Sequence, residues 1–121
     1  MSANLSVLIV EDDPMVALGL AFAAEDAGAI VIGPAASAHE ALSLLTKSII
    51  DAAILDVHLL DGVVTPVALA LLDCATPFIV HTGIGLPDEL ATTRPTIAVV
   101  MKPTLPDQVV QQLLAEVARK V

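Results

Sequence analysis

The chain has 121 residues, the size of one domain, and we expect a single domain over residues 1–121. Its 14 acidic and 5 basic residues give a formal net charge of -9, which repels a phosphate backbone, so no nucleic-acid binding is expected. A lone cysteine excludes an internal disulfide, and residues 1–4 lack the features of a signal peptide, so we predict a cytoplasmic protein. Pro66, Asp73 and Pro77 interrupt the most apolar segment, so no membrane insertion is expected.

The chain begins with a short apolar run that acidic residues follow. Leu5–Val10 predicts a buried strand, and Glu11 and Asp12 come directly after it. Asp13 and Pro14 have the pattern of a helix N-cap and first turn, whereas Glu11 and Asp12 have no such local purpose. The apolar stripe of the predicted helix is assigned to the core: Met15, Leu18, Ala21 and Phe22.

Two further predicted strands follow, and the second of them ends in a carboxylate. Ala29–Gly33 predicts the second strand, and a helix that opens at Ser37 comes after it. The third apolar run, residues 52–55, has no helical period and ends at Asp56, which makes Asp56 the first residue to suspect of chemistry. Cys74, near the end of the next predicted helix, is interpreted as a small buried hydrophobe.

The remaining predicted strands also end in polar residues. The fourth strand leads into His81, which we assign to packing, and Thr82. The segment Leu86–Pro95 contains several Pro and Thr residues, so the fourth helix is expected to be short or irregular. The fifth strand, residues 97–101, runs into Lys102, and an amphipathic helix follows.

Alternating strands and helices predict an α/β, flavodoxin-like (βα)5 fold, a doubly wound parallel sheet with strand order 2-1-3-4-5. In that order the first and third strands are neighbours, so Glu11 and Asp12 lie beside Asp56. Thr82 and Lys102 follow the fourth and fifth strands at the same edge. Open α/β sheets bind ligands at this edge, and we therefore expect the site there.

The residues at this edge indicate a divalent cation and a phosphoryl group. Clustered carboxylates repel one another unless a proton or cation intervenes, and oxygen donors alone favour Mg²⁺ over Zn²⁺. Magnesium suggests phosphate, with Lys102 and Thr82 holding phosphoryl oxygens and Asp56 acting as an in-line nucleophile. The residues thus predict formation of an aspartyl phosphate.

Four segments resemble the signatures of receiver (CheY-like) domains of two-component response regulators. They are residues 7–14, 54–57, 80–83 and 100–103. The resemblance covers nearly the whole chain and extends to a subset of stand-alone, single-domain receivers. It implies a phosphoprotein of a two-component system, or phosphorelay. Such a protein accepts a phosphoryl group from a sensor histidine kinase or histidine phosphotransfer protein and signals by phosphorylation-dependent binding to another protein, here unknown.

The resemblance also implies a role for each residue of the site. Asp56 would be the phosphoacceptor, and Asp12 and Asp56 would contact Mg²⁺ directly. Glu11 would bind the ion through water, and His58 through its backbone carbonyl. The two remaining roles are a switch hydroxyl for Thr82 and a phosphate-binding lysine for Lys102.

Departures from the family leave alternatives open. Val99 stands where many receivers have a switching Tyr or Phe, so we expect the segment Thr82–Pro95 to carry the switch. One alternative is a magnesium-dependent phosphatase with an aspartyl intermediate, although such enzymes have an acid where His58 stands. Another is a receiver-like binding module that is independent of phosphorylation. We expect no enzyme activity beyond the chain's own phosphorylation and dephosphorylation, and a homodimer stays an open option.

Overall fold

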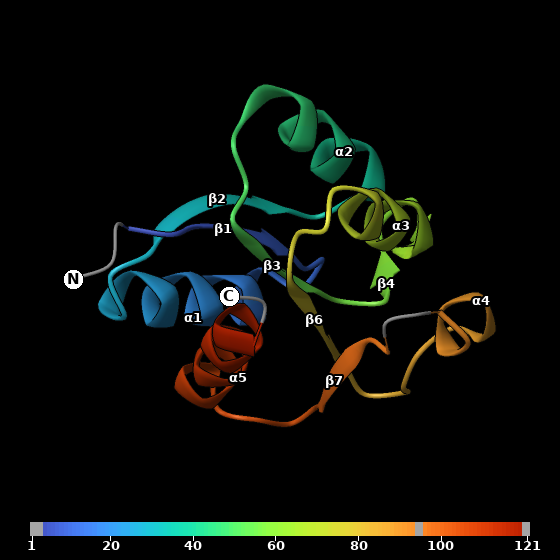
Figure 1. Cartoon of the computed structure of the whole chain (residues 1–121). Coiled ribbons are helices and arrows are strands. Elements are labelled where there is room, and N and C mark those ends of the chain that lie inside the picture. The colour runs from blue at the N-terminus through green and yellow to red at the C-terminus, as the bar shows by residue number, and fades with distance from the viewer. Residues whose placement is uncertain (1–3, 94–95, 120–121) are drawn as a thin grey trace.

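The computed structural model describes residues 4–93 and 96–119, and their central feature is one parallel sheet (Figure 1). The strands are short apolar runs, as expected for a small α/β domain. They are β1 (Ser6–Val10), β2 (Ile30–Ala35), β3 (Ala52–Leu55), β6 (Phe78–Thr82) and β7 (Ala98–Met101). Their order, β2-β1-β3-β6-β7, confirms the predicted order 2-1-3-4-5, since β6 and β7 are the fourth and fifth strands of this sheet.

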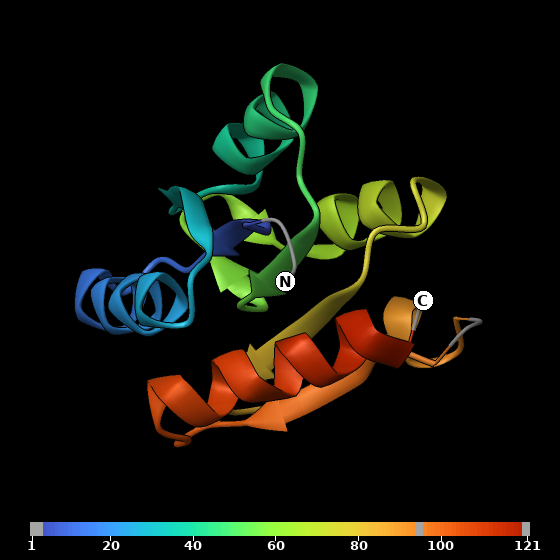
Figure 2. The same ribbon diagram turned by 60° about the vertical axis from the view of Figure 1, so that its left-hand side comes forward.

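Helices connect the strands and cover both faces of the sheet. They are α1 (Pro14–Asp26), α2 (Ala38–Lys47), α3 (Thr65–Asp73), α4 (Asp88–Ala91) and α5 (Pro106–Arg119). In Figure 1, α1 and α5 lie on one side of the sheet, and α2 and α3 on the other. Figure 2 shows α5 running beside β6 and β7. Helix α4 has 4 residues, so the prediction of a short fourth helix is confirmed.

Each face of the sheet has its own hydrophobic core. Successive strand residues point to opposite faces. Leu8 and Leu55 therefore belong to the core beneath α2 and α3, whereas Ile9 and Ile54 belong to the core beneath α1 and α5. Burial on both faces explains why these strands show no polar alternation.

The predicted inward stripe of α1 is wrong for its large members, although Ala21 packs against the core as predicted. Met15 and Phe22 are 76% and 58% exposed, and Leu18 is also exposed, whereas Ala17 and Leu20 are buried. Helix α1 is apolar nearly all round, so its pattern does not select a face. The face turned to the sheet carries Ala17, Leu20 and Ala24, and Met15, Leu18 and Phe22 are left in solvent.

Two further interpretations of single residues also need correction. Cys74 is exposed because it caps the end of α3, where the chain turns away through Ala75, whose φ is 56°. His81 is buried as expected, but it lies inside β6, which continues through Thr82. Among the described residues neither of its ring nitrogens has a hydrogen-bond partner, so His81 is not a satisfied packing residue.

A small antiparallel hairpin follows β3 and was not predicted. Its strands are β4 (His58–Leu59) and β5 (Gly62–Val63). The Asp61 carboxylate accepts hydrogen bonds from the backbone N–H groups of Ala38 (2.7 Å) and His39 (3.0 Å). These bonds attach the hairpin to the first turn of α2. The hairpin follows Asp56, which comes directly after β3.

Among the helices of the described residues, none has both the length and the apolar character needed to span a bilayer. Residues 94 and 95, at the end of the segment Thr82–Pro95 that we expect to switch, lie outside the described residues. So do residues 1–3 and 120–121 of the predicted domain.

Candidate functional site

Three carboxylates meet at the carboxyl ends of β1 and β3. Val10 pairs with Leu55 in the parallel register, so the residues that follow them reach the same level. One oxygen from each of Glu11, Asp12 and Asp56 lies within 4.8 Å of the others. Glu11 is 3% exposed and Asp56 is 9% exposed, so these charges are largely removed from water.

Backbone hydrogen bonds hold this acidic cluster in place. The Asp56 N–H donates to the Val10 carbonyl and the Glu11 N–H to the Ala35 carbonyl, both at 2.8 Å. The Asp56 Oδ1 accepts a hydrogen bond from the Val57 N–H at 2.8 Å. The backbone thus fixes one oxygen of Asp56 and leaves the other, Oδ2, for contacts with side chains and ligands.

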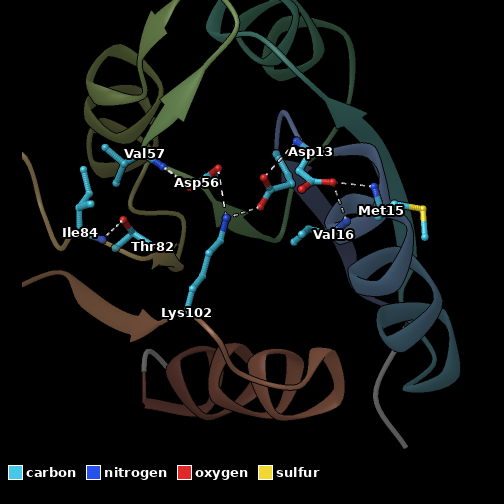
Figure 3. A network of polar contacts seen from close by, with 9 residues as sticks. Asp13, Met15, Val16, Asp56, Val57, Thr82, Ile84 and Lys102 are labelled. Carbon is cyan, nitrogen blue, oxygen red and sulfur yellow. Dashed lines mark hydrogen bonds and ion pairs between the residues drawn. The ribbon is translucent and has the colours of Figure 1, made fainter.

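Lys102 reaches into the cluster from the end of β7 (Figure 3). Its Nζ lies 3.2 Å from Glu11 Oε1 and 3.3 Å from Asp56 Oδ2. The Lys102 N–H donates to the Thr82 carbonyl at 2.8 Å, which ties the base of the lysine to the adjacent strand. One ammonium group therefore joins the ends of three strands.

The protonation of the cluster follows from burial and charge. Burial raises the pKa of Glu11 from 4.5 to about 7, and its hydrogen bond with Asp56 contributes to the rise, while the Asp13 N–H and Lys102 partly oppose it. Burial lowers the pKa of Lys102, but the ion pairs and hydrogen bonds with Glu11 and Asp56 together outweigh burial, so its pKa is raised. Lys102 is thus charged at neutral pH, and Glu11 is close to half protonated.

Thr82 lies at the end of β6 and is almost fully buried. Its hydroxyl oxygen accepts a hydrogen bond from the Ile84 N–H at 3.1 Å, which holds the start of the loop that leads to α4. A hydroxyl can donate its own proton while it accepts another. Thr82 can therefore connect a ligand at the edge of the sheet with this loop.

His58 stands at the start of β4, two residues after Asp56, with its side chain in solvent. The metal-binding role that the resemblance gives it concerns its backbone carbonyl, and that role stays a prediction. The structure thus brings Glu11, Asp12, Asp56 and Lys102 together and places Thr82 beside the lysine.

Two residues with a bearing on the site were missed in the sequence. Asp61 fastens the hairpin after Asp56 to α2, and the two backbone N–H groups that it accepts from lower its pKa. The Asp61-Gly62 pair signals only a turn. The buried, unpartnered state of His81 has no sequence signal of its own.

The fold and this cluster define a class of α/β protein with an anionic site and a lysine at the switch point of the sheet. Solved structures identify the family. The solution structure of SdrG from Sphingomonas melonis Fr1 is 34% identical, with a TM-score of 0.79 over 98% of this chain and 99% of that chain. The REC domain of the PhyR response regulator from Erythrobacter litoralis is 25% identical, with a TM-score of 0.76 over 93% of this chain and 92% of that one. The chain belongs to the CheY-like receiver domains of response regulators.

Other comparisons set the extent of this likeness. A CheY-like receiver domain protein from Methanospirillum hungatei JF-1 has a TM-score of 0.84 at 22% identity, which supports the fold alone; the match covers 98% of this chain and 97% of that one. The response regulator PhyR from Brucella abortus is 31% identical, with a TM-score of 0.77 over 95% of this chain, but the chain spans only 48% of that protein. No family model and no curated protein matches the chain.

Proposed function

We propose that the chain is a receiver that accepts a phosphoryl group on Asp56, in a Mg²⁺-dependent reaction, from a histidine kinase or histidine phosphotransfer protein. The observation that carries this proposal is the position of Lys102. Its ammonium contacts Asp56 and Glu11 at once, beside the acidic cluster at the switch point. A cation beside the carboxylate is what phosphoryl transfer to that carboxylate needs, because the incoming group is strongly anionic.

The residues present fit a magnesium ion. All the side-chain donors are carboxylate oxygens within 4.8 Å of one another, and Glu11 and Asp56 are buried, so a divalent cation would offset charges that water hardly reaches. Glu11, Asp12 and Asp56 would hold the ion together with the backbone carbonyl of His58. When bound, magnesium supplies positive charge that offsets the charge of the carboxylates and the phosphoryl oxygens.

The chain's own residues would then act as follows. An oxygen of Asp56 attacks the phosphorus, an O–P bond forms, and the P–N bond to the donor histidine breaks, its electron pair returning to the imidazole. Oδ2 suits this role because the backbone already occupies Oδ1. The Lys102 ammonium and the Thr82 hydroxyl bind two of the phosphoryl oxygens.

The output of such a receiver would be a change of protein partner, since a net charge of -9 disfavours DNA. The surface beside β7 and α5 suits this output. Val99 and Met101 are exposed there on an edge strand, and β7 leads directly into Lys102. A pull-down in which the phosphorylated and unphosphorylated forms retain the same partners would favour a phosphate sink instead.

Intact mass spectrometry after incubation with Mg²⁺ and acetyl phosphate tests the proposal. The wild type is expected to gain one phosphoryl mass and Asp56→Asn none, because an amide is not a usable nucleophile. Asp73→Asn, at an exposed end of α3, is the matched control and should be labelled like the wild type. Continuous turnover of a small phosphate ester would favour the phosphatase alternative, and neither labelling nor turnover would favour the binding module.

A further inference from the structure

His81 is a buried polar residue with no role in the site as described so far. It is 4% exposed, and among the described residues neither ring nitrogen has a hydrogen-bond partner. Leaving buried polar atoms unpaired costs free energy, so an apolar residue would serve better if the position were only a packing position.

The face of the sheet on which His81 lies follows from strand alternation. Ile79 belongs to the core beneath α1 and α5, so His81, two residues later, points to the same side. Its register partner on β7 is Val100, which packs against that same core. Lys102 follows Val100 by two residues, and a Cβ placed on Gly83 would lie 4.0 Å from the Lys102 Cβ. The side chain of Lys102 therefore starts on the face that carries His81.

Lys102 must then cross β6 to reach its partners. Strand β6 lies between β7 and β3, and the Lys102 Nζ is 3.3 Å from Asp56 Oδ2 at the end of β3. Neighbouring strands are about 4.8 Å apart, so the lysine side chain extends across the end of β6 and the Asp56 side chain covers the rest of the distance from β3. His81 is the last residue of β6 that points to this face.

Electrostatics agree with this placement. Burial lowers the pKa of His81, the positive charge of Lys102 lowers it further, and the negative charge of Asp56 opposes both. The lowered pKa keeps the imidazole neutral at neutral pH. A neutral imidazole keeps one nitrogen free to accept a hydrogen bond.

We propose that His81 is a positioning residue for Lys102. The imidazole supports the lysine where it crosses β6. Neither ring nitrogen has a hydrogen-bond partner among the described residues, so one is free to accept the third ammonium hydrogen when the lysine shifts toward a ligand, since Glu11 and Asp56 face the other two. His81 thereby holds the ammonium over Asp56 and sets how fast the phosphoryl group is accepted and how long it is retained. The kinetic part rests on the function proposed above, whereas the contact between His81 and Lys102 does not.

A double-mutant cycle on unfolding tests the contact without any phosphoryl donor. The metal-free wild type, His81→Leu, Lys102→Ala and the double variant are unfolded with urea. His81→Leu keeps the side-chain volume and removes both nitrogens. Lys102→Ala lowers the ratio of folded to unfolded protein, and we expect this factor to be about five times smaller in the His81→Leu background than in the wild type. Equal effects of Lys102→Ala in the two backgrounds would overturn the proposal.

Labelling with acetyl phosphate and Mg²⁺ tests the kinetic part. We expect His81→Leu to be labelled about fivefold more slowly than the wild type. Adding His81→Leu to Lys102→Ala should not slow labelling further, because the lysine is already absent. His81→Gln, which restores a neutral acceptor, should recover most of the rate. Ile79→Val is the control for a change in the same core and should keep the wild-type rate.

The outcomes separate the two proposals. If the wild type is not labelled, the proposed function fails, and the unfolding cycle still decides whether His81 acts on Lys102. If the wild type is labelled and His81→Leu matches it in rate and lifetime, only the proposal for His81 is overturned. If His81→Leu does not fold, the same comparisons are made with His81→Gln and His81→Asn, whose acceptors stand at different positions. If both variants are labelled as slowly as Lys102→Ala, a neutral acceptor at position 81 does not help the lysine, and the proposal is overturned.

Discussion

At the scale of single residues, Glu11 is the carboxyl group of the site whose ionisation most destabilises the folded state. It is almost fully buried, and its nearest charged neighbours are another carboxylate and one lysine. A carboxyl whose pKa is higher in the folded than in the unfolded state binds more protons when folded. Its stabilising contribution is complete below the unfolded pKa of 4.5 and is lost as pH rises through the folded pKa of about 7.

The first prediction concerns this pH dependence. Without metal, the free energy of unfolding of the wild type should fall by about 1–3 kcal/mol between pH 5 and pH 8. Glu11→Gln cannot ionise and should show a flatter profile over the same range. Urea unfolding in a chelating buffer measures both profiles, and parallel curves for the two proteins would contradict the assignment.

The second prediction concerns Lys102. Lys102→Ala leaves two buried carboxylates without their cation and should cost about 2 kcal/mol at pH 8. At pH 5 the loss should be smaller, because Glu11 is then protonated. Lys47→Ala, at the exposed end of α2, is the control and should change little at either pH. A loss that is larger at pH 5 would argue against the ion pairs.

At the scale of elements, the segment after β6 is the best candidate for a moving part. The Ile84 N–H donates to the Thr82 hydroxyl oxygen, so a Thr82 hydroxyl that donates to a phosphoryl oxygen links that oxygen to the loop at this point. Beyond the loop, α4 is held by the buried side chain of Leu90 and by the hydrogen bond from the Thr65 hydroxyl to Glu89. A helix of only 4 residues has little internal hydrogen bonding to hold it in place, so it can shift readily.

Hydrogen exchange gives the third prediction. With Mg²⁺ and beryllofluoride, which mimics a phosphoryl group on Asp56, we expect a change in exchange between Thr82 and Thr93. Thr82→Ala should lose most of that change, because only the hydroxyl links the ligand to the loop. No difference in this segment of the wild type would contradict the proposed switch.

The order of strands and the composition of the site could be predicted because both depend on local pattern. Buried runs such as residues 52–55 have no polar alternation, and topology places Asp56 beside Glu11. The orientation of α1 could not be predicted, because a helix that is apolar nearly all round gives no preferred face. The state of His81 depends on contacts across three strands, which a local pattern does not contain.

At the scale of the whole molecule, folding brings negative charge into a small volume. The chain has a net charge of -9, and its carboxyl edge concentrates three carboxylates around one lysine. The unfolded chain spreads these groups apart, so their repulsion acts on the folded state alone. A bound cation should therefore stabilise the protein through this one site.

Magnesium linkage is the fourth prediction. Removing one carboxylate with Asp56→Asn should raise metal-free stability by about 1 kcal/mol, because Lys102 already offsets part of the repulsion. Magnesium should stabilise the wild type by about 2.7 kcal/mol at a concentration 100-fold above its dissociation constant. It should do so far less for Asp12→Ala, and Asp26→Ala, an exposed acid at the end of α1, should respond like the wild type. A wild type indifferent to magnesium would show that the three carboxylates do not form a cation site.

The central claim is that Asp56, held between the acids and Lys102, is the residue that receives the phosphoryl group. The most direct measurement labels the protein with acetyl phosphate and Mg²⁺, reduces the acyl phosphate with borohydride, which converts a phosphorylated aspartate to homoserine, and locates that residue by peptide mass spectrometry. We predict homoserine at position 56 alone, and none when a chelator replaces Mg²⁺. Homoserine at another position, or labelling of Asp56→Asn to the same extent as the wild type, would contradict the account.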